Sequence, residues 1–145
     1  MTADSITASI VIDAPAEIVF DYFTQTDAIV GWMGEFALLE PEPGGTFEVN
    51  ILGTPVRGRY LLVDRPNRLR ISWGYAGSDD LPPGASTVEI TLTPVQAGTL
   101  VELVHSGLKG RQPQEHVVGW THYLARLQSA VRGGGAGVDR GMPAA

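Results

Sequence analysis

The most constraining feature of this sequence is a long run with a period of two, followed by a single long helical pattern. Between Phe36 and Ser106, apolar and polar residues alternate repeatedly, as they do in half-buried β-strands. Short stretches rich in glycine and proline divide this run into segments. Consecutive strands joined by short turns predict an antiparallel meander, whose apolar face must be covered by another layer.

Six strands are expected within this run, and one more precedes it. The earlier strand covers residues 6–12, where isoleucine and alanine occupy alternate positions. The strand at 56–64 has apolar residues on both faces, and we interpret Val56, Tyr60 and Leu62 as its inner residues. The later strands are expected at residues 36–40, 47–51, 56–64, 68–75, 87–93 and 99–106.

Helical periodicity flanks the strands on both sides. A helix is expected over residues 15–24, because Pro15 suits a first helical turn and the apolar residues after it recur at helical spacing. A second, shorter helix is expected to run towards Trp32. The sequence predicts one domain over residues 1–132 and a flexible, glycine-rich tail over residues 133–145. The last helix is expected over residues 113–132, with one apolar stripe of Val117, Trp120, Leu124, Leu127 and Val131.

Composition and charge exclude several classes of protein. The formal net charge is −6, which repels phosphate backbones, so we expect no nucleic-acid partner. We expect no membrane span either, because no apolar run approaches the roughly 20 residues that a spanning helix needs. Cysteine is absent, which excludes disulfides, thiolate nucleophiles and cysteine metal sites. Residues 1–5 carry no basic side chain, so we expect no signal peptide and a cytoplasmic location.

The last helix is the only long element available to cover the sheet. A curved sheet held away from a helix leaves a space, and spaces lined by apolar and aromatic groups bind small molecules. The three tryptophans, Trp32, Trp73 and Trp120, each lie on an element that can face this space. The alternative is that they fill a solid core, because large aromatic side chains also dominate ordinary cores.

The order and spacing of short motifs along nearly the whole chain carry a family resemblance. The chain resembles the START-like superfamily, also called SRPBCC or helix-grip, and within it the homologues of the C-terminal domain of the heat-shock-protein-90 ATPase activator. The motifs are Ala14-Pro15, Val19-Phe20, Trp32, Gly44-Gly45 before Phe47, Gly58, Pro66 with Arg68-Leu69, Ser72-Trp73, Gly98-Thr99, Val101, Leu103 with His105-Ser106-Gly107, and Gly119-Trp120 with Tyr123-Leu124.

The resemblance implies an α+β helix-grip fold with a cavity between a curved antiparallel sheet and the C-terminal helix. It also implies an apolar ligand, because members of the superfamily bind lipids, sterols and polyketides there. We therefore expect a binding protein for a lipid-like or aromatic compound. Two alternatives stay open. One is a cyclase, dehydratase or hydrolase; the other is a protein-interaction module, chaperone-linked or a homodimer, for which Leu100 and Val104 offer an apolar surface.

His105 is the only candidate for catalysis. It follows Val101 and Leu103 on one strand face, so it is expected to point inward under the helix. A neutral imidazole there orients a polar ligand atom or acts as a general base. The alternative is a buried histidine bonded to a backbone carbonyl or to a helix side chain, since no partner residue that would orient a catalytic base is evident.

No metal or cofactor is expected. His116 and His122 lie six residues apart on the last helix, and about 100° per residue turns them some 120° away from each other. Basic residues on two neighbouring strands, at 57, 59, 68 and 70, are expected to pair with Glu48 or Glu89. The predicted walls of the cavity are Trp32, Phe47, Val49, Ile51, Tyr60, Leu69, Ile71, Trp73, Tyr75, His105, Trp120 and Tyr123.

Overall fold

The secondary structure follows the order that the alternating and helical patterns predict. The computed structural model describes residues 5–133, 136–137 and 139–141. A strand, two short helices, six strands and a long helix follow one another, which confirms the predicted α+β architecture. The elements are β1 Ile6–Ile12, α1 Ala16–Thr24, α2 Thr26–Ile29, β2 Phe36–Leu39, β3 Thr46–Ile51, β4 Thr54–Asp64, β5 Arg68–Trp73, β6 Ser86–Val95, β7 Gly98–Ser106 and α3 Gln112–Val131.

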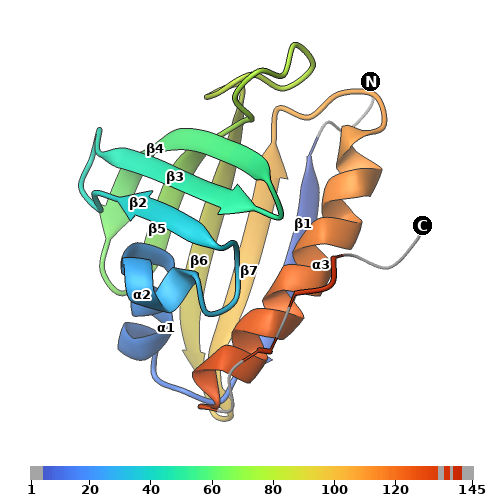
Figure 1. Ribbon diagram of the computed structural model, residues 1–145. Coiled ribbons are helices and arrows are strands. Elements are labelled where there is room, and N and C mark those ends of the chain that lie inside the picture. The colour runs from blue at the N-terminus through green and yellow to red at the C-terminus, as the bar shows by residue number, and fades with distance from the viewer. Residues whose placement is uncertain (1–4, 134–135, 138, 142–145) are drawn as a thin grey trace.

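The strands form one antiparallel sheet in the order β1-β7-β6-β5-β4-β3-β2 (Figure 1). Strands β2 to β7 make the predicted meander, each paired with the next along the chain. β1 pairs with β7, so the first and last strands lie side by side. α1 and α2 therefore connect the two edges of the sheet, since β1 and β2 are at opposite ends of the strand order.

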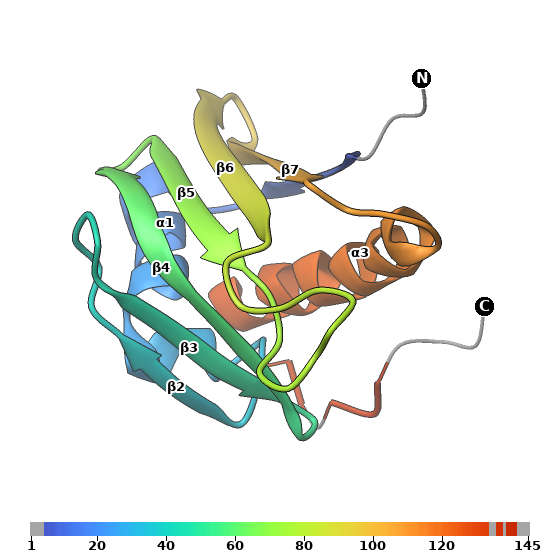
Figure 2. The ribbon, with the colours of Figure 1, turned by 90° about the horizontal axis from the view of Figure 1, so that it is seen from above.

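The helices cover the concave face of the sheet. Figure 2 shows α3 running across the open side of the curved strands. α1 packs against β6 and β7, and α3 packs along β1. Phe20 and Phe23 of α1 are buried with Trp32, which follows α2, and these side chains fill one end of the space under the sheet. The ring centroids of Phe23 and Trp32 are 5.2 Å apart in an edge-to-face contact.

A β-bulge in β4 corrects one prediction. The register shifts between Tyr60 and Leu62, so that Val63 lies opposite the buried Leu69 and Leu62 lies opposite Arg70. Because one extra residue reverses the faces of the strand beyond it, Val63 rather than Leu62 packs against the core. Val56 and Tyr60, which precede the bulge, are buried as expected.

The outer face of the sheet carries the predicted cross-strand ion pairs. Arg57 lies 3.9 Å from Glu48, and Glu89 binds both Arg68 and Arg70. The hydrogen bond from Arg68 and the charges of both arginines lower the pKa of Glu89, although burial works in the opposite direction. Partly exposed pairs of this kind contribute about 0–1 kcal/mol each. They confirm the expected pairing for Arg57, Arg68 and Arg70. The prediction is wrong for Arg59, whose guanidinium instead donates a hydrogen bond of 3.0 Å to the carbonyl oxygen of Gly44.

Residues 136–137 and 139–141, called the returning tail below, lie against α3. Arg126 donates hydrogen bonds to the carbonyl oxygens of Ala136 and Gly137, at 3.2 and 3.0 Å. The prediction of a flexible tail did not anticipate these contacts. That prediction also covers residues 134, 135, 138 and 142–145, which lie outside the described residues, as do residues 1–4.

Candidate functional site

A cavity of about 550 Å³ lies between the sheet and the N-terminal half of α3. This volume falls within the range of about 300–1,000 Å³ that small-molecule sites occupy. Its lining combines the β3–β4 turn, the end of β5 and one face of α3. The lining residues are Met33, Ile51, Leu52, Thr54, Val56, Trp73, Tyr75, Glu115, His116, Gly119, Trp120 and Tyr123.

Two indole rings form the floor of the cavity. Trp73 at the end of β5 and Trp120 on α3 have ring centroids 5.2 Å apart and are almost fully buried. Gly119 lies beside Trp120, and a Cβ atom built on it meets nothing within 4 Å. The glycine therefore leaves open space on a helix face that is otherwise filled by large side chains.

Beneath this floor, a chain of hydrogen bonds holds His105. The indole N–H of Trp120 donates to Nδ1 of His105 over 3.0 Å. Ser86 Oγ donates to the carbonyl oxygen of Trp73 over 2.7 Å, so its lone pair accepts from Nε2–H of His105 over 2.8 Å. Both ring nitrogens are thus occupied, and the imidazole is fixed as the neutral Nε2–H tautomer.

Burial lowers the pKa of His105 to about 3, and the neighbouring His116 adds to this effect. The side chain is fully buried and lies outside the cavity lining. A general base needs a free nitrogen within reach of its substrate. The geometry therefore matches the alternative of a histidine bonded to a helix side chain and gives no support to catalysis by His105.

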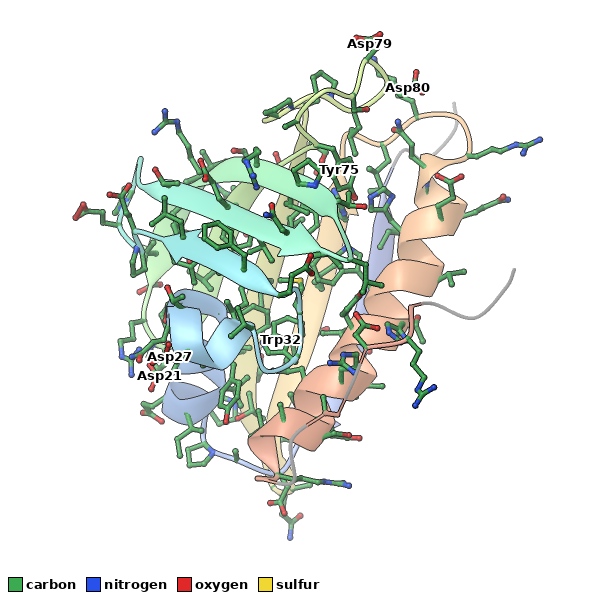
Figure 3. All side chains as sticks on the ribbon, viewed as in Figure 1. Asp21, Asp27, Trp32, Tyr75, Asp79 and Asp80 are labelled. Atoms are coloured by element: carbon green, nitrogen blue, oxygen red, sulfur yellow. The ribbon has the colours of Figure 1, made fainter. Side chains whose placement is uncertain are left out.

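Tyr75 and His116 supply the polar end of the cavity. Figure 3 shows Tyr75 at the end of the sheet that faces the start of α3, whereas Trp32 lies at the other end of the space. The Tyr75 hydroxyl lies 2.9 Å from Nε2 of His116 and accepts a hydrogen bond of 3.1 Å from the indole N–H of Trp73. Burial lowers the pKa of His116 and raises that of Tyr75, so both groups are neutral near pH 7.

A second, more polar hollow of about 710 Å³ adjoins the cavity at Tyr75, Glu115 and His116. The loop between β5 and β6 forms its far wall and arches between the sheet and the start of α3 (Figure 2). Gln112 ties this loop to the helix by donating a hydrogen bond of 3.0 Å to the carbonyl oxygen of Asp80. Asp79 and Asp80 of the loop are among the residues that line the hollow, and they lie at the top of the view in Figure 3.

On the opposite side of the cavity, Tyr123 anchors the returning tail. Its hydroxyl donates a hydrogen bond of 2.5 Å to Oδ2 of Asp139, and Nε2 of His122 lies 3.0 Å from Oδ1. Burial works to raise the pKa of Asp139, but the hydrogen bonds from Tyr123, the Gly141 amide and His122 outweigh it and lower the pKa. Burial and the bond to Asp139 raise the pKa of Tyr123.

The structure brings part of the predicted wall to the cavity. Ile51, Trp73, Tyr75, Trp120 and Tyr123 line it. The rest are packed in the core outside the lining, because α1, α2 and the middle of the sheet close on each other there. These core residues are Trp32, Phe47, Val49, Tyr60, Leu69, Ile71 and His105. The set as ligand contacts remains a prediction.

His116 and Ser86 were not predicted to belong to the site, although the position of each residue in its helix or strand indicates that it faces inward. His116 lies four residues before Trp120, so the stripe that places Trp120 inward also places His116 inward. Ser86 has the same parity as Val88 and Ile90 in β6, which places it on the inner face beside His105. Glycine at 119 and the turn residue Leu52 left no comparable pattern.

Among the described residues, no group of three histidine, aspartate or glutamate side chains lies close enough together to hold a metal ion. In the same residues, no helix is both long and apolar enough to cross a bilayer. The arrangement offers a partly open, concave apolar surface with a few neutral polar groups, which suits binding of an uncharged, largely apolar molecule.

The curved sheet gripped by a C-terminal helix defines the START-like, helix-grip class of α+β proteins. Within this class, the family model described as "Activator of Hsp90 ATPase homolog 1-like protein" matches residues 13–132. The chain belongs to this family, which confirms the resemblance read from its motifs. No curated protein matches the chain.

Solved structures agree with this assignment. The AHSA1-like protein of Rhizobium etli is 38% identical with a TM-score of 0.75, and the match covers 96% of this chain and 88% of that one. CalU16 of Micromonospora echinospora is 32% identical with a TM-score of 0.74 over 89% of this chain and 74% of that one. The Aha1 dimer of Colwellia psychrerythraea, at 20% identity and a TM-score of 0.77 over 92% and 98% of the two chains, shares the fold.

Proposed function

We propose that this protein binds an uncharged small molecule, lipid-like or aromatic, in the cavity between the sheet and α3. The observation that carries the proposal is the cavity of about 550 Å³, open on one side, whose floor is formed by Trp73 and Trp120. Binding is driven by burial of apolar surface, at about 25 cal/mol per Å² before the costs of association. Tyr75, held in place by His116, supplies the polar contact that orients the molecule.

The test uses a variant that fills the cavity without disturbing its walls. Gly119→Leu adds a side chain where a Cβ meets no other atom, and leucine is a better helix former than glycine. Thr121→Leu is the matched control, because Thr121 is an exposed residue of the same helix outside the lining. Both variants and the wild type are heated with fatty acids, sterols, polyketide-like aromatics and quinones.

A ligand present at 100 times its Kd adds about 2.7 kcal/mol to the free energy of unfolding, which raises the Tm by several degrees. We expect such a rise for the wild type and for Thr121→Leu, and none for Gly119→Leu. A ligand that stabilises all three proteins equally binds elsewhere and contradicts the proposal. If no compound raises the Tm of the wild type, the result favours a protein partner over a small-molecule ligand.

A second candidate function, association with another copy of this chain, rests on the edge strand β2. Phe36 and Leu38 lie on its outer face and are 47% and 49% exposed, two apolar side chains at the end of a sheet. The surface at Leu100 and Val104 is less continuous, because Glu102 lies between them. Sedimentation velocity of the wild type and of Leu38→Asp tests this: a dimer that the substitution dissociates supports it, and a wild-type monomer contradicts it.

Catalysis and location stay as secondary proposals. A cyclase, dehydratase or hydrolase reaction in this cavity would have to use the hydroxyl of Tyr75, with His116 as the acceptor of its hydrogen bond, since His105 lies outside the cavity lining. A turnover that survives both Tyr75→Phe and His116→Phe would exclude these two side chains from the reaction.

The cytoplasmic location expected from the sequence is a separate proposal, which cell fractionation tests.

A further inference from the structure

The polar side chains around the cavity have already used their hydrogen-bond donors on one another. The indole N–H of Trp73 goes to Tyr75, and the indole N–H of Trp120 goes to His105. The hydroxyl of Tyr123 donates to Asp139. Each of these groups has one hydrogen to give, so none has a hydrogen left for a ligand.

The protons on Tyr75 and His116 can be assigned in the same way. Nδ1 of His116 lies 2.8 Å from the carbonyl oxygen of Gln112, which only accepts, so Nδ1 carries the hydrogen. Because the ring is neutral, Nε2 is an acceptor, and the hydroxyl of Tyr75 donates to it over 2.9 Å. The Tyr75 oxygen already accepts from Trp73, which leaves it one unused lone pair and no unused hydrogen.

The two other polar side chains on the lining do not change this balance within the cavity. Glu115 carries a carboxylate, which accepts hydrogen bonds when ionised. Thr54 has a hydroxyl, but it is an exposed residue at the rim, where water competes for that hydrogen. The enclosed part of the lining therefore offers acceptors only.

We propose that the cavity selects ligands that donate a hydrogen bond, namely apolar or aromatic molecules bearing a hydroxyl or amine, over otherwise equal molecules bearing an ether or a ketone. The unused lone pair of Tyr75 receives the ligand hydrogen. A ketone meets no donor there and leaves its oxygen buried without a partner, which costs affinity. This inference rests on the proposed function, because it names the ligand class of the same site.

Three probes of nearly equal ring structure test the selection: 2-naphthol, 2-methoxynaphthalene and 2-acetonaphthone. Isothermal titration calorimetry gives the Kd of each for the wild type. We expect 2-naphthol to bind about threefold to tenfold more tightly than the ether or the ketone, the effect of one net hydrogen bond. Equal affinities for all three overturn the inference.

His116→Phe tests the proton assignment directly. It removes the acceptor of the Tyr75 hydroxyl while keeping an aromatic ring, so the hydroxyl becomes free to donate to a ligand. We expect the affinity for 2-acetonaphthone to rise about threefold to tenfold relative to wild type. Thr121→Phe, at an exposed position of the same helix outside the lining, is the matched control and should leave the order of affinities unchanged. An unchanged preference in His116→Phe contradicts the assignment.

Tyr75→Phe is the second variant, in case His116→Phe does not fold. It releases the N–H of Trp73 and Nε2 of His116 together, so the preference for 2-naphthol should disappear. A preference that persists overturns the inference. If the three probes bind wild type equally and Gly119→Leu blocks all of them, the proposed function stands and the selection fails. If no probe binds and no compound of the wider panel raises the Tm, the proposed function fails and the inference fails with it.

Discussion

Trp120 on α3 donates its indole N–H to Nδ1 of His105 on β7 over 3.0 Å, and this bond joins the helix to the inner face of the sheet. The other ring nitrogen of His105 donates to Ser86 on β6. One buried imidazole thus links three elements directly beneath the cavity floor. The bond from Trp120 requires the neutral form, because a protonated Nδ1 cannot accept a hydrogen bond. The role of His105 in this structure is therefore to hold the floor in place.

Removing the indole N–H should weaken the protein. Trp120→Phe leaves Nδ1 of His105 buried without a donor, which costs about 1–3 kcal/mol in free energy of unfolding. Urea denaturation followed by circular dichroism measures the loss. In a His105→Leu background, the same substitution leaves no buried acceptor without a donor, so it should lower the free energy of unfolding by less. An equal cost in both backgrounds would assign the effect to lost packing instead.

Stability should fall as the pH drops below about 6.5. Burial lowers the pKa of His105 to about 3 in the folded protein, whereas an unfolded histidine titrates near 6.5. Between these values the unfolded chain binds a proton that the native chain does not, so acid favours unfolding by about 1.4 kcal/mol per pH unit. The lowered pKa of His116 acts in the same direction.

Urea denaturation at pH 7 and pH 5 checks this dependence. His105 alone should account for a loss of about 2 kcal/mol over that interval. His105→Gln should show a shallower slope, whatever its absolute stability, because glutamine does not titrate. A variant with the wild-type slope would show that other groups control the acid sensitivity.

Two glycines should respond to alanine in opposite ways. Gly119 lies in α3 with open space at its Cβ position, so Gly119→Ala should stabilise the fold by about 0.5–1 kcal/mol. At Gly58 in β4, a Cβ would lie 1.8 Å from the carbonyl oxygen of Ser72 on the neighbouring strand. Gly58→Ala should therefore lower the Tm while Gly119→Ala raises it. The same sign for both would contradict the described packing.

The returning tail should loosen when Asp139 is removed. Its carboxylate accepts hydrogen bonds from Tyr123 and from the amide of Gly141. Asp139→Ala should accelerate hydrogen exchange at Gly141 and reduce the free energy of unfolding by about 1 kcal/mol. The neighbouring, exposed Arg140 provides the control, since Arg140→Ala should change neither quantity appreciably. Equal exchange in the two variants would argue against the Asp139 anchor.

Local periodicity was sufficient to predict the strands, the helices and the inward face of most residues. Alternation placed Trp73 and His105 on the inner face, and the helical stripe placed Trp120 there. These predictions succeed because a side chain's face depends only on its own element. The bulge between Tyr60 and Leu62 was not predicted, because one added residue leaves no visible change in a strand pattern that is apolar on both faces.

The position of the cavity depended on how distant elements pack. The aromatic residues of α1 and the segment after α2 fill one end of the space, so core residues such as Tyr60 and Trp32 resemble cavity walls in sequence but are packed solid. The other end of the space under the sheet stays open, because Gly119 has no side chain at the point where α3 faces the sheet. Sequence alone determined which residues face inward. Only the tertiary structure decided which of them meet each other and which meet empty space, since the width of a gap depends on both of its walls.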